Sequence, residues 1–445
     1  MKLENWLFAS AAAAPERLAL IAGGERLTYS QLEHRAASAA RRLAGLGAGR
    51  GKRVALVLEG SAEYVVLLHA LTKLGAVAVP IDPRLAGGEL DSRLELAEAA
   101  LVIRAVEEVS DAAEREAPLE PRVDQDFPHC VIFTSGTGGS ARPVELSYGN
   151  HVWSALGSAV RIGVDARDRW LCCLPLHHIG GLAIVLRSAI YGTAVVLERF
   201  EAGAIGSLIR SEGVTLISLV GTMLARLLDA GAELDRLRCA LLGGGPVQQG
   251  LIERALASGV PIAPTYGLTE AASQVTTLAP GEAGRKPGSA GTPILPAEVR
   301  ISDGAILVRG PNVAAGQIGP DGWLRTGDRG RVDADGHLYV IGRGDEMIVT
   351  GGENVSPEEI EQALSEHPAV TEAGVVGRED PEWGEAVVAA VVLKEGASAS
   401  EPELREFCRE RLATYKVPKR IGFVERLPRD AQGKLRRKEI SLPRN

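Results

Sequence analysis

A run of small polar residues near the middle of the first half of the chain could bind phosphate. It reads FTSGTGGSARP, residues 133–143, at the end of the apolar run CVIF. Backbone N–H groups of such a loop can approach phosphate oxygens closely, the hydroxyls add donors, and Arg142 adds positive charge. It is not a Walker A loop, because no G-K-[ST] follows. The segment predicts a phosphate loop, with a surface turn as the alternative.

A carboxylate and a hydroxyl stand side by side in YGLTEAAS, residues 266–273, where Glu270 follows Thr269. Mg²⁺ binds through few protein oxygens plus the phosphates of a substrate, so this pair predicts a magnesium site. The glycine run at 243–245 lies upstream and offers flat backbone against which a planar base can lie. The alternative for Glu270 is an exposed residue at the start of a helix.

Three further polar positions could complete a nucleotide site. Asp328, in WLRTGD, is a suitable acceptor for ribose hydroxyls, and Arg343, in GRGDE, offers a further contact. Lys434 follows a glycine turn in PRDAQGKLRRKEI near the C-terminus. Taken singly, the first two residues are common in turns and on surfaces, and the third belongs to a solvated basic tail.

A largely parallel sheet must position these segments, because short apolar runs alternate with helical spacers from residue 29 onward. Helices are predicted at 29–46 and from Ser61, a favourable N-cap. Residues 107–128 are polar and predict a surface connection. The apolar runs that we interpret as strands are RVALVLEG, AVAVPID, LVIRAV, CVIFTSG, RWLCCLPL, TAVVLE, TLISLV and CALLGGG.

The pattern changes after about residue 297, where Gly and Asp turns separate short strands and indicate a β-rich subdomain. Beyond it, strands and two helices, at 357–367 and 401–412, form an α+β unit of about 100 residues, a usual size for a small domain. We therefore predict an α/β protein. Its large N-terminal domain, residues 1–344, has parallel sheets covered by helices plus the β-rich subdomain, and a small α+β domain follows at 345–445.

Composition excludes other classes of function. At 445 residues the chain needs more than one core, and with 4% aromatic residues those cores must be built from Ala, Val, Leu and Ile. A formal net charge of −8, with Lys and Arg scattered, argues against binding nucleic acid or a membrane surface. The 5 cysteines are odd in number and form no C-x-x-C pair, so we expect reduced thiols in a cytoplasmic protein.

Two further expectations concern membranes and assembly. The N-terminus has no basic n-region, so we expect no signal peptide. The most apolar stretch, residues 64–81, is interrupted by His69, Lys73 and Pro80, so we expect no transmembrane segment. A homo-oligomer is compatible with the sequence.

The motifs occur in an order that resembles the acyl-adenylate-forming superfamily, which contains acyl- and aryl-CoA synthetases, luciferases and adenylation domains. The resemblance covers nearly the whole chain. TSGTGG resembles the phosphate loop of that family, YGLTE its magnesium and nucleotide motif, and TGD its ribose motif. GRGDEMIVTGGENVSPEEIE resembles the hinge and the start of the mobile C-terminal domain, and LPRDAQGK the catalytic-lysine motif.

The resemblance implies an enzyme that uses ATP, Mg²⁺ and coenzyme A in two steps. A carboxylate attacks the α-phosphate of ATP, and the acyl-adenylate then passes its acyl group to a thiol. Lys434 is expected to stabilise charge at the reacting oxygens and Glu270 to hold Mg²⁺. The residues expected to bind the nucleotide are Thr134, Ser135, Gly136, Thr137, Gly138, Gly139, Gly244, Gly245, Pro246, Tyr266, Gly267, Thr269, Asp328 and Arg343.

Asp345 matches the hinge position of the family. Rotation there is expected to withdraw Lys434 and to bring TGGENV, residues 350–355, to the thiol channel. The phosphate loop departs from the usual T-S-G-T-T-G-x-P-K-G, because the chain has Gly138, Ala141, Arg142 and Pro143 where Thr, Pro, Lys and Gly are usual. Arginine keeps the cation but offers a planar fork in place of a point charge, which alters the contact with the β- and γ-phosphates.

LCCLPLHHIGGLAIVLRSAIYGT, residues 171–193, and YGLTEAASQVTTL are most like the o-succinylbenzoate–CoA ligases of menaquinone biosynthesis. That substrate has two carboxylates, of which one is activated, and Arg187 stands where these ligases carry a basic residue. The alternative is that Arg187 extends to solvent. His178 matches a position that gates the acyl pocket, whereas His177 is predicted to pack or cap locally. Further residues predicted to line the acyl site are Ser273, Gln274 and Thr277.

Other functions remain open at this point. The chain could be another aryl- or acyl-CoA synthetase, or a stand-alone enzyme that loads a carrier protein. A more remote alternative is a non-catalytic nucleotide-binding relative. Because Lys434, Glu270 and Asp328 are all present, the sequence favours an enzyme.

Overall fold

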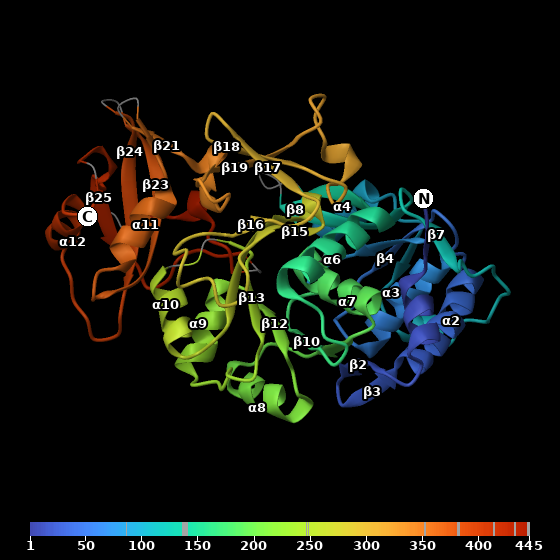
Figure 1. Cartoon of the computed structure of the whole chain (residues 1–445). Coiled ribbons are helices and arrows are strands. Elements are labelled where there is room, and N and C mark those ends of the chain that lie inside the picture. The colour runs from blue at the N-terminus through green and yellow to red at the C-terminus, as the bar shows by residue number, and fades with distance from the viewer. Residues whose placement is uncertain are drawn as a thin grey trace.

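The chain forms a large domain with a small C-terminal domain at one end, next to strands of the β-rich subdomain (Figure 1). In Figure 1 the small domain is coloured orange to red and the first two-thirds of the chain blue to yellow. The computed structural model describes residues 1–85, 87–135, 141–245, 247, 249–350, 353–380, 383–412, 414–430 and 433–442.

The first sheet of the large domain is parallel except at one edge. Its central strands are apolar because helices cover both faces, as in other parallel sheets. The edge strand β9 returns antiparallel from β8 as a hairpin. In spatial order the strands are β6 (Leu101–Ile103), β4 (Arg53–Leu56), β5 (Val77–Pro80), β8 (Pro128–Ser135) and β9 (Ala141–Ser147). A separate antiparallel pair joins β1 (Lys2–Glu4) to β7 (Arg122–Asp124).

The second sheet is larger and has a parallel centre with antiparallel strands at both edges. Its order is β16 (Thr292–Pro293), β15 (Ser273–Thr277), β14 (Ile262–Leu268), β13 (Cys239–Leu242), β12 (Leu216–Leu219), β10 (Arg169–Cys172), β11 (Ala194–Leu197), β2 (Leu18–Ala22) and β3 (Glu25–Thr28). All residues of β11, β12 and β13 are buried, which explains why these runs are apolar except for Ser218, whose hydroxyl accepts from Trp170 Nε1 at 3.0 Å.

Helices fill the space between the two sheets and cover their outer faces. Thr28 and Gln31 form a capping box at the start of α2, and Ser61 caps α3 as predicted. Between the sheets, α6 contacts both β9 and β15. The helices are α1 (Trp6–Ala13), α2 (Tyr29–Gly45), α3 (Ala62–Leu74), α4 (Gly87–Leu96), α5 (Glu107–Ser110), α6 (Tyr148–Ile162), α7 (Ile179–Tyr191), α8 (Ala202–Glu212), α9 (Gly221–Asp229) and α10 (Gln249–Ala257).

The β-rich subdomain and the small domain follow. The subdomain is an antiparallel sheet of β17 (Glu298–Ser302), β18 (Ala305–Arg309), β19 (Leu324–Val332) and β20 (Leu338–Arg343). The small domain has the strand order β22 (Glu353–Val355), β21 (Ile348–Thr350), β24 (Gly384–Leu393) and β23 (Val370–Asp380), with β25 (Arg420–Phe423) also pairing with β24. Its helices are α11 (Pro357–Ser365) and α12 (Glu401–Arg409). The short 3-10 helices are η1 (Thr269–Ala271), η2 (Ala315–Gln317), η3 (Gly344–Glu346), η4 (Thr414–Lys416) and η5 (Arg437–Glu439).

The predicted α/β class is confirmed, and three local predictions need correction. The phosphate loop is shorter than 133–143, because Thr134 pairs with Arg142 and the strands of the hairpin extend to either side of it. Residues 107–128 are not a simple connection, since they contain α5 and β7. The three predicted helices 29–46, 357–367 and 401–412 each end one to three residues earlier than expected.

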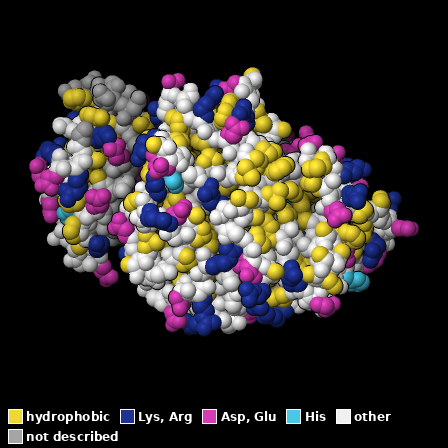
Figure 2. Space-filling view, in the orientation of Figure 1, with side chains coloured by type: hydrophobic (Ala, Val, Ile, Leu, Met, Phe, Trp, Pro, Cys, Tyr) yellow, Lys and Arg dark blue, Asp and Glu magenta, His cyan; other side chains and the backbone are white. Residues whose placement is uncertain are grey.

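The surface mixes charges of both signs. Figure 2 shows Lys and Arg side chains interspersed with Asp and Glu on the visible face, and apolar side chains gathered over α6. The exposed apolar side chains there include Leu156, Val160 and Leu295. This distribution agrees with a net charge of −8 spread over the chain. Within the described residues, every helix is too short or too polar to cross a bilayer.

Close packing of α6 against the segment before β17 depends on Gly157. A methyl group there would lie 2.2 Å from the carbonyl oxygen of Leu295. We expect Gly157→Ala to lower the free energy of unfolding by about 1–3 kcal/mol, because backbone must move to admit the methyl group. Urea unfolding measures this.

The matched control is Gly203→Ala in α8, where a methyl group meets nothing within 4 Å. Alanine is the better helix former, so this variant should be unchanged or more stable by up to about 1 kcal/mol. Equal stability of the two variants would contradict the packing argument.

Candidate active site

The predicted site residues gather where the parallel strands end. The carboxyl ends of β5, β8, β10, β13 and β14 lead to Asp82, the phosphate loop, the His177–His178 pair, the 243–245 glycines and Thr269. In open parallel sheets, ligands bind at this edge, because the connecting loops there can be shaped without disturbing the core. The region at the carboxyl ends of these parallel strands is therefore the candidate active site.

Tyr266, Asp328 and Arg343 form one hydrogen-bonded group, although they come from β14, β19 and β20. The Tyr266 hydroxyl donates to Asp328 Oδ2 at 2.7 Å, and Arg343 Nη1 lies 3.2 Å from Asp328 Oδ1. Burial and the adjacent Asp328 charge raise the pKa of Tyr266 well above its usual value, so the phenol keeps its proton. The structure thus brings together the side chains predicted to bind adenine and ribose.

The segment that carries Glu270 is fixed by its own backbone. The carbonyl oxygens of Glu270, Ala271 and Ala272 accept, in turn, from Ala314 N at 2.8 Å, Asn312 Nδ2 at 3.2 Å and Ser154 Oγ at 2.7 Å. The Glu270 side chain is half-buried, and in the part of the chain that the structure describes its carboxylate has no hydrogen-bond or ion-pair partner. A fixed carboxylate with free oxygens suits a magnesium ion, as predicted for Glu270 and the neighbouring Thr269.

Backbone strain marks the same segment. Ala272 has a φ of 51° and Ser273 a φ of 98°, in the region that side-chain-bearing residues rarely occupy. Gly267 is required opposite them, because a methyl group there would lie 1.7 Å from the Ser273 carbonyl oxygen. Strained backbone that neighbouring groups hold in place is frequent at functional sites.

The glycine run beside this segment has a special geometry as well. Gly244 has a φ of 85°, and a methyl group on it would lie 2.9 Å from Val220. A methyl group on Gly245 would meet nothing within 4 Å, so one side of this glycine is open. Such bare backbone is what a stacked base needs. The predicted Pro246 lies outside the described residues.

The described structure covers the two ends of the predicted phosphate loop. Gly136, Thr137, Gly138 and Gly139 lie outside the described residues, as does the side chain of Ser135. Thr134 is the residue before the last of β8, and its hydroxyl lies 3.5 Å from the Arg142 carbonyl oxygen. The roles of these residues therefore stay predictions.

Lys434 lies in a turn that touches the large domain. Its backbone N donates to Asp430 Oδ1 at 2.8 Å, and Gly433 supplies the positive φ, 79°, that the turn needs. A methyl group on Gly433 would lie 3.7 Å from Thr222 Oγ1, at the start of α9. The Lys434 side chain is exposed. The turn that carries the predicted catalytic lysine is thus docked on the large domain near the strand ends.

Ion pairs connect the C-terminal segment that carries Lys434 and Arg437 to the predicted hinge. The Arg437 guanidinium donates to Glu361 Oε2 at 2.8 Å, lies 2.9 Å from Glu358 Oε1, and also pairs with Glu346. Glu346 is the last residue of η3, which contains the predicted hinge residue Asp345. The side chain of Asp345 lies outside the description.

His178 stands at the N-cap of α7, beside the docked turn. Burial lowers its pKa, and the charges of Asp82 and Asp430 act in the opposite direction, which places the small-domain carboxylate of Asp430 near the imidazole. His177 Nε2 lies 3.6 Å from Asp82 Oδ2, and burial lowers the pKa of His177 to about 4. Both rings are neutral at pH 7, so they act as hydrogen-bonding groups without charge.

Arg187 is buried in the large domain, with a relative exposure of 3%. Its Nη2 donates to Ser154 Oγ at 3.0 Å, its Cζ lies 5.9 Å from the centre of the Trp170 ring, and its Nε has no partner within the described residues. Burial lowers the pKa of Arg187, a sign of the cost of keeping charge there. The alternative in which Arg187 extends to solvent is wrong.

The other predicted acyl-site residues lie on β15. Gln274 and Thr277 are buried, and Gln274 Nε2 donates to Thr277 Oγ1 at 2.7 Å. Thr277 Oγ1 also lies 2.9 Å from Thr265 Oγ1, so its hydroxyl is engaged within the protein. Gln274 Oε1 has no partner within the described residues and can accept one more hydrogen bond. The acid-binding roles of Ser273, Gln274 and Thr277 remain predictions.

Sequence reasoning missed the polar face of α6. Asn150 Nδ2 donates at 2.9 Å to the carbonyl oxygens of both Pro311 and Val313, and Ser154 makes the contacts given above. Both residues are buried in a helix whose neighbours are largely apolar. Their four-residue spacing in GNHVWSALGS puts them on one face, and that polar spacing was the available signal.

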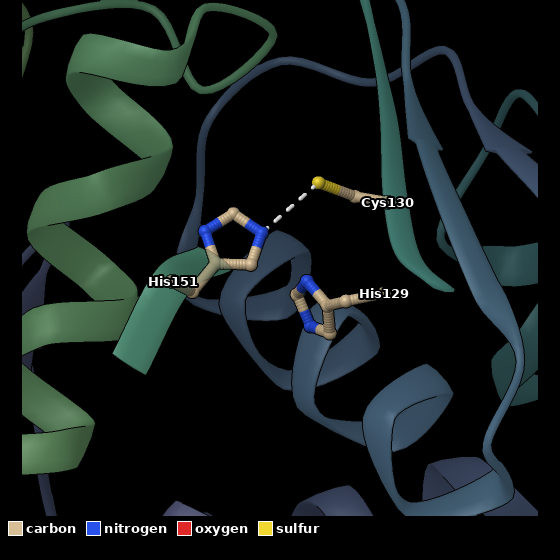
Figure 3. Close-up of side chains that lie close together, drawn as sticks. All are labelled: His129, Cys130 and His151. Atoms are coloured by element: carbon tan, nitrogen blue, oxygen red, sulfur yellow. Dashed lines mark hydrogen bonds between the residues drawn. The ribbon is translucent and has the colours of Figure 1, made fainter. Parts of the chain in front are cut away.

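A second buried group lies between β8 and α6 and consists of His129 and Cys130 from β8 and His151 from α6 (Figure 3). His151 Nε2 lies 3.3 Å from Cys130 Sγ, and His129 Nε2 lies 3.1 Å from Thr72 Oγ1. A bulge in β8 at His129 lets consecutive side chains face the same helix. Burial raises the pKa of Cys130 and lowers that of His151 to about 3, so these are neutral groups paired within the core.

Comparison with known proteins identifies the family. The AMP-binding enzyme model matches residues 7–317, and the AMP-binding enzyme C-terminal domain model matches residues 359–434. The chain belongs to the AMP-binding enzyme family. It is 42% identical to the 2-succinylbenzoate–CoA ligase of Geobacillus kaustophilus, over 98% of this chain and 97% of that protein.

Solved structures show the same similarity. The o-succinylbenzoate CoA synthetase (MenE) of Bacillus subtilis, in complex with the acyl-adenylate intermediate OSB-AMP, is 37% identical and superposes with a TM-score of 0.93, covering 100% of this chain and 99% of that one. A double mutant of the same enzyme, bound with its product analogue OSB-NCoA, is 38% identical and has a TM-score of 0.75, with coverage of 99% and 98%.

The Tyr266–Asp328 hydrogen bond provides a test of the nucleotide site. We expect Tyr266→Phe to weaken AMP binding by about 10-fold, because a charge-assisted hydrogen bond that orients Asp328 is lost while the ring remains. Isothermal titration calorimetry measures the affinity. The matched control is Tyr339→Phe, which removes the 3.3 Å contact of another tyrosine hydroxyl with Asp333. The same loss of affinity in both variants would count against the assignment.

Proposed function

We propose that the chain is an ATP-dependent, AMP-forming acid–thiol ligase whose acid is a dicarboxylate, with o-succinylbenzoate as the substrate and o-succinylbenzoyl-CoA as the product. The observation that carries the choice of acid is the buried Arg187, which lacks a carboxylate partner in the described part of the chain. The relatives named above support the same acid. Menaquinone biosynthesis is the pathway that the sequence resemblance predicts for it.

The first half-reaction forms the acyl-adenylate. A carboxylate oxygen of the acid bonds to the α-phosphorus of ATP, and the bond between that phosphorus and the pyrophosphate oxygen breaks. Asp328 and Arg343 hold the ribose, Tyr266 and Gly244 the adenine, and Thr134 with the phosphate loop the pyrophosphate. Glu270 would hold Mg²⁺, which when bound would offset the negative charge of the phosphates. Lys434 stabilises the charge that develops on the reacting oxygens.

The second half-reaction transfers the acyl group. The thiol sulfur of coenzyme A bonds to the acyl carbon, the bond to the adenylate oxygen breaks, and AMP leaves. In our proposal the small domain rotates about Asp345 between the two steps, withdrawing Lys434. The higher TM-score with the adenylate-bound relative than with the one that holds a product analogue supports this reading, because the docked Lys434 turn then belongs to the first step.

Physical chemistry favours a diacid at Arg187. A buried cation without a counter-charge costs several kcal/mol, and a cation that meets only a hydroxyl is compensated in part. A second carboxylate, not consumed in the reaction, would complete the pair with charge-assisted hydrogen bonds. A monocarboxylic acid would leave the guanidinium uncompensated after its own carboxylate enters the bond to phosphorus.

Two alternative ligase functions differ from this proposal in the acid or in the thiol that accepts the acyl group. Another aryl- or acyl-CoA synthetase would release pyrophosphate with other acids, and a carrier-loading enzyme would prefer a phosphopantetheine arm on a protein to free coenzyme A. Pyrophosphate release with a panel of acids, followed by acyl transfer to either thiol, separates them. A non-catalytic relative would release none.

Location and assembly remain predictions. The five cysteines are free and buried in the described structure, which suits the reduced cytoplasmic setting expected from the sequence. Association into a homo-oligomer is tested by light scattering of the purified chain.

Replacing Arg187 tests the choice of acid. We expect Arg187→Met to raise KM for o-succinylbenzoate by about 10–100-fold, since a charged hydrogen bond contributes about 1.5–3 kcal/mol. KM for benzoate should change little. Because the cation meets no carboxylate in the described part of the free protein, the free energy of unfolding without substrates should stay the same or increase.

The control for this experiment is Arg226→Met on α9, where the guanidinium is exposed and stacks on Phe200 at 5.1 Å. Steady-state kinetics should not distinguish it from the unmodified enzyme. A parallel rise of KM for the diacid and for benzoate in Arg187→Met would remove the argument for a diacid.

Replacing Lys434 tests the two-step mechanism. We expect Lys434→Ala to slow adenylate formation by about 10²–10³-fold, because a pre-aligned donor to the developing charge is lost. Thioester formation from a supplied acyl-adenylate should be spared. Quench-flow assays of each half-reaction measure the rates, with Lys438→Ala, also exposed, as the control. Equal loss in both half-reactions would exclude the assigned role.

A further inference from the structure

The guanidinium of Arg187 and the Glu270 segment share one hydrogen-bonding partner. Ser154 Oγ accepts from Arg187 Nη2 at 3.0 Å and donates to the Ala272 carbonyl oxygen at 2.7 Å. Ser154 is 2% exposed and Ala272 is 1% exposed, so water does not compete for either bond. One hydroxyl therefore connects the buried cation to the backbone two residues after the magnesium-binding carboxylate.

The backbone on the receiving side is held in a strained conformation. Ala272 has a φ of 51°, and such a conformation persists only where its surroundings fix it. Of its two neighbours in the segment, Ala271 is held by Asn312 and Glu270 by the Ala314 backbone, both outside α6. Ser154 is thus the link from the acid-binding side of the segment to Glu270.

We propose that Ser154 is a positioning residue that couples recognition of the substrate's second carboxylate at Arg187 to the placement of Glu270 for Mg·ATP. The inference rests on the dicarboxylic acid ligase function proposed above and extends it. A carboxylate that pairs with Arg187 fixes the guanidinium, the guanidinium fixes the orientation of the Ser154 hydroxyl, and that hydroxyl holds the Ala272 carbonyl. The bound diacid then increases the affinity of the enzyme for Mg·ATP. By thermodynamic linkage, bound Mg·ATP increases the affinity for the diacid by the same factor.

The polar character of α6 supports a dedicated role. A buried serine hydroxyl in a helix can bond back to the carbonyl four residues earlier, yet Ser154 Oγ instead contacts groups on α7 and after η1. Asn150, one turn earlier, fixes the Pro311 and Val313 carbonyls next to Asn312. The inner face of α6 therefore reaches the Glu270 segment on two sides, directly through Ser154 and indirectly through Asn312.

The test measures coupling between the ligands. The dissociation constant of Mg·ATP is measured with and without saturating o-succinylbenzoate, for Ser154 and for Ser154→Ala. Both proteins carry Lys434→Ala, which slows turnover so that binding can be measured before it. We expect the diacid to tighten Mg·ATP binding several-fold in the Ser154 background and less than 2-fold in Ser154→Ala. With benzoylpropionate, which lacks the ring carboxylate, the two backgrounds should give the same small effect.

Two variants separate positioning from packing. Ser158→Ala removes a hydroxyl from the same buried face one turn later and should leave the coupling intact. Ser154→Thr retains a hydroxyl and should restore most of the coupling lost in Ser154→Ala. Because these variants are compared through a ratio of dissociation constants, a uniform loss of folded protein does not change the result.

The outcomes distinguish failure of the proposed dicarboxylate function from failure of the role proposed for Ser154. If the unmodified background binds the diacid no better than benzoylpropionate, the dicarboxylate function itself fails. If it binds the diacid better but Ser154→Ala keeps the full coupling, or Ser158→Ala loses it equally, then the role of Ser154 is overturned while the proposed function stands.

Discussion

A buried positive charge that meets no carboxylate among the described residues is the feature on which the rest of the site depends. Arg187 sits between α6 and α7, where it meets a serine hydroxyl and the ring of Trp170. Burying a charge in this way lowers the stability of the free protein, so the position makes sense where a ligand supplies the missing anion. The two sheets and their intervening helices then serve to hold that cation near the strand ends where we propose that the nucleotide binds.

The nucleotide side of the site is built by different means. Backbone contacts fix the Glu270 segment, and a tyrosine and an arginine orient Asp328. The small domain adds Lys434 from a turn docked near Thr222, while Arg437 ties the same tail to Glu346 beside the hinge. Rotation at the hinge would therefore move the lysine as part of a rigid unit.

Much of this arrangement could be predicted from the sequence. The Tyr266, Asp328 and Arg343 motifs identified residues that do lie together, and the apolar runs identified the parallel strands. Ser154 was missed because its function comes from contacts with residues 33 and 118 positions away, which no local pattern encodes. The burial of Arg187 was undecided for the same reason, since helix periodicity shows which residues share a face but not what that face meets.

The most direct test of the account is the thermal stability of the protein with each acid alone. A ligand that binds the folded state raises Tm according to its affinity. Because the second carboxylate is what compensates the guanidinium, o-succinylbenzoate should raise Tm markedly, and at equal concentration benzoylpropionate, which lacks the ring carboxylate, should raise it little. Equal shifts with the two acids would show that the buried cation does not select the substrate, and would contradict the account.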